Sequence, residues 1–99
     1  MKEVINQVFE IEQKAAAQKA GLFDRNLRRL YHEFEREGYV VKDPLGEKFS
    51  EQRTDIDATI MGELNGNLKI TKVLKPIIFK KEHDSMLLVQ KGVVLVGVS

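Results

Sequence analysis

The feature that most constrains the fold of this chain is a change of hydrophobic period near its middle. Residues 2–37 contain no proline and repeat apolar side chains every three or four positions, which is typical of amphipathic helices. From residue 49 onward apolar and polar side chains alternate, as in strands with one buried face. This order predicts an α+β fold, with N-terminal helices forming a helical hairpin or half of a bundle, before a small, mainly antiparallel β-domain. We place a helical dimerisation segment at residues 1–42 and the β-domain at residues 43–99.

Two apolar ladders run along the helical segment with the narrow spacing of a coiled-coil seam or a bundle helix. Either one long helix passes through Gly21, at a cost of about 1 kcal/mol relative to Ala, or the helix stops and restarts near Asp24, whose carboxylate can cap free N–H groups. We favour two helices, the second ending at Gly38.

The length of the chain leaves little interior in which to bury both ladders. We therefore expect two copies to form a homodimer through their helices, because covering an exposed apolar stripe is favourable. The residues expected to supply core and dimer packing are Val8, Phe9, Leu27, Leu30 and Phe34.

Turn and bulge signals divide the β-domain. Asn65-Gly66 predicts a hairpin between the strand around residues 54–61 and the next strand. The alternation slips near Val73, which indicates a β-bulge, and Pro76 has no N–H for a ladder. A polar tip at residues 80–85 precedes a final strand at residues 86–98, in which Gly92 predicts a bend or a close backbone approach.

Charge and residue content exclude several function classes. The 16 basic and 15 acidic side chains nearly balance, so we expect no nucleic-acid partner. Cysteine is absent, the two histidines lack metal-ligand spacing, and no glycine-rich phosphate loop exists, so we expect no metal and no cofactor. No apolar run is long enough for a signal peptide or a membrane span, so we expect a cytoplasmic protein without a membrane partner.

The sharpest indication of an enzyme is the pair Asp55 and Asp57, whose spacing suits acid–base work or a divalent cation. The alternative, which we favour, is that both lie on the solvated face of a strand and oppose edge-to-edge aggregation. Arg53 supports this alternative, because an ion pair weakens any argument for a raised carboxyl pKa. We therefore expect a protein that is not an enzyme.

Four segments, at residues 30–39, 43–49, 70–76 and 92–96, together resemble the GrpE family in their order and spacing. Residues 30–39 are similar to the family segment in which a bundle helix ends at a glycine, and residues 43–49 are similar to its turn with a glycine and then phenylalanine. Residues 70–76 resemble an Ile-x-x-Val-Leu-x-Pro strand, and residues 92–96 resemble the closing valine-rich strand. The resemblance covers residues 22–99.

The chain also departs from the family pattern. Ile56-Asp57-Ala58 stands where the family usually has His-Glu-Ala, and the stretch before it is two residues longer. The tip lacks the arginine of the family's Asn-Gly-Arg. Because only about twenty residues precede Gly21, we expect most of the family's long paired helix to be missing.

The resemblance implies a nucleotide exchange factor for a DnaK-type ATPase chaperone. In this family a homodimer presents its β-domain to the nucleotide-binding domain of the chaperone, and binding favours an open cleft that releases ADP. The expected contact face combines the tip with the last strand, through Lys80, Lys81, His83 and Val96. The alternative is a dimeric adaptor or assembly module that has the same fold and no exchange activity.

Overall fold

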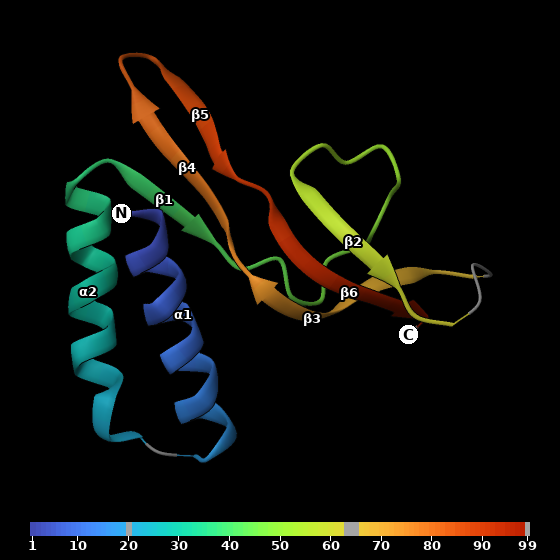
Figure 1. Cartoon of the computed structure of the whole chain (residues 1–99), viewed down its shortest axis with the longest axis horizontal. Helices are drawn as coiled ribbons and strands as arrows, with labels where there is room; N and C mark the ends of the chain where they lie inside the picture. The colour runs from blue at the N-terminus through green and yellow to red at the C-terminus, as the bar shows by residue number, and fades with distance from the viewer. Residues whose placement is uncertain (20, 63–65, 99) are drawn as a thin grey trace.

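In the part of the chain that the computed structural model describes, two α-helices precede six strands (Figure 1), which confirms the predicted α+β fold. The structure describes residues 1–19, 21–62 and 66–98. The helical part consists of α1 (Lys2–Ala17), a 3-10 helix η1 (Gly21–Phe23) and α2 (Asp24–Arg36). The strands are β1 (Tyr39–Lys42), β2 (Ile56–Ile60), β3 (Leu68–Lys75), β4 (Ile77–Glu82), β5 (Ser85–Gln90) and β6 (Gly92–Val98).

The helices form an antiparallel pair (Figure 1), broken where the sequence predicts a break. The expected cap differs in detail, because Phe23 rather than Asp24 occupies the N-cap position and makes no side-chain cap bond. Asp24 instead lies in the first turn, where its negative charge favours the free N–H groups of the helix end. Gly38 follows α2 with a φ of +91°, the left-handed backbone typical of a residue that ends a helix.

The strands form two three-stranded sheets. Sheet A has the order β1-β4-β5 and is antiparallel throughout. Sheet B has the order β2-β6-β3, with β2 parallel and β3 antiparallel to the central strand β6. The expected final strand over residues 86–98 is therefore wrong as a single element, because Lys91 divides it into two strands of different sheets.

The chain changes sheets at Gly92, where the predicted close approach is confirmed. A Cβ atom built there would lie 2.9 Å from Ile77 Cγ1 and 3.2 Å from Ile56 Cδ1. Only glycine leaves room for the two sheets to meet this closely. The backbone N–H of Gly92 also donates to the carbonyl oxygen of Asp55 at 2.9 Å, which joins this junction to the start of β2.

The hairpin predicted at Asn65-Gly66 is wrong in its pairing. β2 and β3 are not hydrogen-bonded to each other, because β6 lies between them. Asn65 lies outside the described residues, whereas Gly66 has the positive φ of +89° that the turn signal implies. The bulge predicted near Val73 is confirmed by the shifts in the β3–β6 register on either side of it.

Helices and strands share two hydrophobic cores. In the first, Phe9 of α1 packs with buried residues of the strands, namely Ile56, Ile70, Val73, Ile77, Val94 and Val96. In the second, residues from both helices pack against β4, namely Ile5, Val8, Leu27, Phe34 and Ile78. Because α1 contributes to both cores and β1 pairs with β4, the segment 1–42 is packed closely onto the β-domain.

A polar pair fixes α1 against the point where the sheets diverge. Asn6 Nδ2 donates to Gln90 Oε1 at 2.8 Å, and Gln90 Nε2 donates in return to Asn6 Oδ1 at 2.9 Å and to the Pro76 carbonyl at 2.8 Å. Asn6 is the one buried polar side chain among the described residues. Its amide is satisfied by this exchange, which removes most of the cost of burying it.

Candidate interaction surface

The two carboxylates that suggested an enzyme are held in ion pairs. Arg53 Nε and Nη2 donate to the two carboxylate oxygens of Asp55 at 3.1 and 3.0 Å, and Arg53 Nη1 lies 3.1 Å from Glu47. These bonds lower the pKa of Asp55 below its ordinary value, against the opposing effect of partial burial. Asp57 lies 3.9 Å from Lys91. The bonds from Arg53 thus favour the ionised carboxylate of Asp55.

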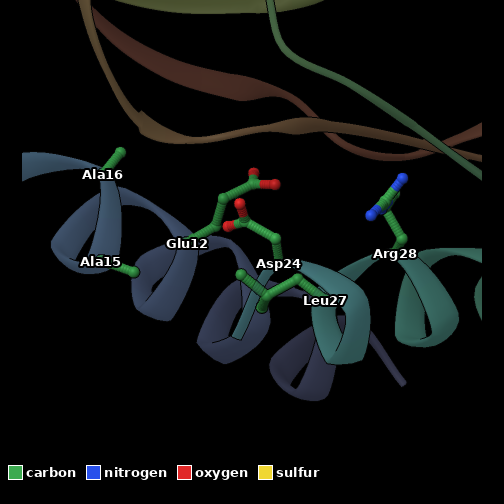
Figure 2. A pocket seen from close by; sticks show the side chains of 6 residues that line it. All are labelled: Glu12, Ala15, Ala16, Asp24, Leu27 and Arg28. Atoms are coloured by element: carbon green, nitrogen blue, oxygen red, sulfur yellow. The ribbon is translucent and has the colours of Figure 1, made fainter. Parts of the chain in front are cut away.

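Figure 2 shows a groove between the two helices, lined by Glu12, Ala15, Ala16, Asp24, Leu27 and Arg28. Glu12 and Asp24 contribute the two carboxylates of its lining, and Arg28 contributes its one cation. The hydroxyl of Tyr31 donates to Glu12 Oε1 at 3.1 Å, and burial is the main reason that the pKa of Tyr31 is raised. Within residues 1–19, 21–62 and 66–98, no group of three His, Asp or Glu side chains is placed to hold a metal ion.

Four of the five residues expected to pack the helices are buried inside the chain itself. Val8, Leu27 and Phe34 lie in the core against β4, and Phe9 lies in the core of sheet B. Leu30 remains 41% exposed. The chain therefore buries more of the apolar side chains of its helices than its length suggested. A helix-to-helix contact between two copies would rest on Leu30 and on the exposed apolar residues near it.

Three of the four expected chaperone-binding residues lie together at the end of the β4–β5 hairpin. Figure 1 shows this hairpin reaching beyond the ends of both helices. Lys81 and His83 are exposed, and His83 opens the two-residue turn with a φ of +54°. Lys80 is less exposed, because its Nζ lies 4.8 Å from the centroid of the Tyr39 ring in a cation–π contact.

Val96, the fourth expected contact residue, lies elsewhere. It sits in the centre of sheet B, opposite Ile60 of β2 and Ile70 of β3, and its exposed fraction is 0%. A side chain with no exposed surface cannot contact a partner, so the expected role of Val96 is wrong and Val96 is a core residue. The tip in sheet A and Val96 in sheet B do not form one face.

The exposure of β5 is a surface feature that the sequence did not reveal. Four consecutive side chains of this strand, Met86, Leu87, Leu88 and Val89, are between 38% and 47% exposed. An apolar run predicts a strand equally well whether the strand is buried or exposed. The sequence therefore predicts one strand over residues 86–98 where the structure has β5 and β6. One signal in the sequence could have separated β5 from β6. Residues 85–90 carry no charge, and the charged residues Asp84 and Lys91 bound them on either side, next to the predicted turn.

No protein-family model, curated protein or solved structure matches this chain. The likeness to the GrpE family therefore rests on the sequence segments quoted above. Of the helices that the structure describes, none combines the length and the apolar character needed to cross a bilayer.

Proposed function

We propose that this chain binds the ATPase domain of a DnaK-type chaperone in the cytoplasm, as a homodimer, and promotes the release of ADP. The observation that carries the proposal is the exposed tip of the β4–β5 hairpin, which holds Lys80, Lys81 and His83 on one projecting arm. The family resemblance supplies the identity of the partner. In the described residues the candidate carboxylates are ion-paired, so binding accounts for the surface better than catalysis does.

The two lysines are presented on different faces of the hairpin. Successive residues of a strand point to opposite faces, so Lys80 lies beside its cross-strand neighbour Leu87 and Lys81 lies beside Met86. The tip thus presents one cation on each face of the arm. Lys80 is also held in place by Tyr39, which lowers the entropy lost when it binds a partner.

Exchange requires no covalent step by this protein. A partner that binds the open nucleotide cleft more tightly than the closed cleft shifts the chaperone towards the open state. A preference of about 2.7 kcal/mol raises the ratio of open to closed chaperone about a hundredfold. An arm with cationic groups at its end can supply such a preference by entering a cleft that only the open state offers.

The release of labelled ADP from a DnaK-type chaperone, measured with and without this protein, tests the proposal. We expect release to accelerate as the protein concentration rises, and the double variant Lys80→Ala/Lys81→Ala to reduce both binding and acceleration. Lys14→Ala is the matched control, because Lys14 is an exposed lysine on α1, far from the tip. Absence of both binding and acceleration would contradict the proposal.

The second candidate is an adaptor or assembly module without exchange activity. It is favoured by the apolar side chains that stay exposed on the helices and along β5. Binding to the chaperone without faster ADP release, or equal behaviour of the lysine variant and its control, would favour this candidate.

A further inference from the structure

We infer that two copies of this chain pair through the outer edge of β5 and form one continuous six-stranded antiparallel sheet. β5 ends sheet A, and none of the described strands pairs with its outer side. The inference does not depend on the proposed exchange activity.

The composition of β5 sets it apart from the other edge strands. Edge strands of soluble proteins commonly carry charged residues, which prevent pairing with other chains. The other three edge strands follow this rule, with Lys42 in β1, Asp57 in β2 and three lysines in β3. β5 reads Ser-Met-Leu-Leu-Val-Gln, contains no charge, and exposes all four of its apolar side chains. It is therefore the edge that gains most from being covered.

The backbone of β5 is arranged to accept another strand. The two-residue turn at residues 83–84 makes Glu82 and Ser85 the closing hydrogen-bonded pair of the hairpin. Because hydrogen-bonded and non-hydrogen-bonded pairs alternate along an antiparallel ladder, the N–H and C=O groups of Met86 and Leu88 point away from β4. The one register shift of the hairpin is near Ile78, at the other end of β5, so this stretch keeps a regular outer edge.

Symmetry then selects the register. Paired residues of neighbouring strands point to the same face, so a two-fold axis normal to the sheet places one residue opposite its own copy. With Leu87 at the axis, Met86 of each chain lies opposite Leu88 of the other. The outward backbone groups of both chains are then all paired, which gives four hydrogen bonds between the two copies.

The charges that flank β5 favour a second copy in this antiparallel arrangement. Asp84 precedes the strand and Lys91 follows it. Antiparallel pairing brings the Asp84 end of each chain beside the Lys91 end of the other, whereas parallel pairing would bring like charges together. The edge is therefore complementary to itself in both charge and apolar character.

Charge-swap variants at Leu87 provide the test, with the mass of the species in solution measured by analytical ultracentrifugation over a range of concentrations. We expect a dimer for the unmodified protein and a monomer for Leu87→Lys and for Leu87→Glu, because each variant places like charges directly opposite each other at the axis. Mixing the two variants should restore a dimer with one copy of each. This recovery also shows that both variants are folded.

Leu30→Lys is the control for association through the helices, and we expect it to remain a dimer. A monomeric unmodified protein at every concentration overturns the inference. So does a monomeric Leu30→Lys beside a dimeric Leu87→Lys, which would assign the contact to the helices. Leu87 variants that stay monomeric when mixed would contradict the pairing centred on Leu87.

Discussion

β5 and β6 follow each other in the chain and are both rich in Val and Leu, yet their surroundings are opposite. β6 lies between two strands, and its side chains Val94 and Val96 are buried in the core. Among the described strands β5 pairs with β4 alone, and its apolar side chains are exposed. The apolar character of a strand therefore does not determine whether it stabilises the monomer. Burial depends instead on whether another element covers a face of the strand, since the edge strands β2 and β3 bury Ile56 and Ile70 in the same core as Val94 and Val96.

The largest expected difference between the two regions is in the free energy of unfolding. Ile70→Ala removes a fully buried side chain opposite Val96 and should lower that free energy by about 2–5 kcal/mol. The comparison variant Leu88→Ala, in β5, should cost less than about 1 kcal/mol in the monomer, since its side chain is already partly in water. Urea denaturation, at concentrations where the protein is monomeric, measures both. Equal costs would mean that β5 is as well packed as sheet B.

A smaller effect is expected at Gly92, where the chain passes from β5 to β6. Gly92→Ala places a methyl group within 2.9 Å of Ile77 Cγ1 and forces the two sheets apart, at a cost of about 1–3 kcal/mol in the free energy of unfolding. Gly97→Ala is the control, because its nearest neighbour would be Thr71 Cγ2 at an ordinary 3.5 Å. The thermal midpoint should fall for the first variant and change little for the second. The opposite ranking would contradict the close approach at this junction.

The smallest expected change in the free energy of unfolding comes from removing the ion pair that precedes β2. Arg53 lowers the pKa of Asp55 in the folded state, so this pair contributes stability above the carboxyl pKa of the unfolded chain, about 3.9, and loses it as the pH falls through the lower folded-state value. Asp55→Asn should therefore cost less than about 1 kcal/mol at neutral pH, as for other partly exposed pairs, and nothing at strongly acidic pH. Denaturation midpoints of both proteins between pH 7 and acid check this convergence. A cost for Asp55→Asn that persists in strong acid would show that the ion pair is not its cause.

Local backbone features were predictable from the sequence because each depends on a few adjacent residues. The break before Asp24, the left-handed Gly38 and the bulge near Val73 all follow from the conformational limits of glycine or from an interrupted alternation. The ion pair of Arg53 with Asp55 was predictable for the same reason, since the two residues are only two positions apart.

The choice of strand partners was decided by the tertiary structure. β2 pairs in parallel with β6, so Ile56 faces Gly92 across 36 positions of the chain, although the turn signal at residues 65–66 favoured the next strand. This choice buried Val96 and left Leu87 at an edge, two positions that look alike in the sequence. The hydrophobic periodicity of the sequence indicates which side chains can be buried. The residues that bury them come from distant parts of the chain. The sequence by itself thus determined the two helices and the position of the apolar strand segments. The packing of the two sheets decided that residues 86–98 divide at Lys91 and which of the resulting apolar strands stays exposed at an edge.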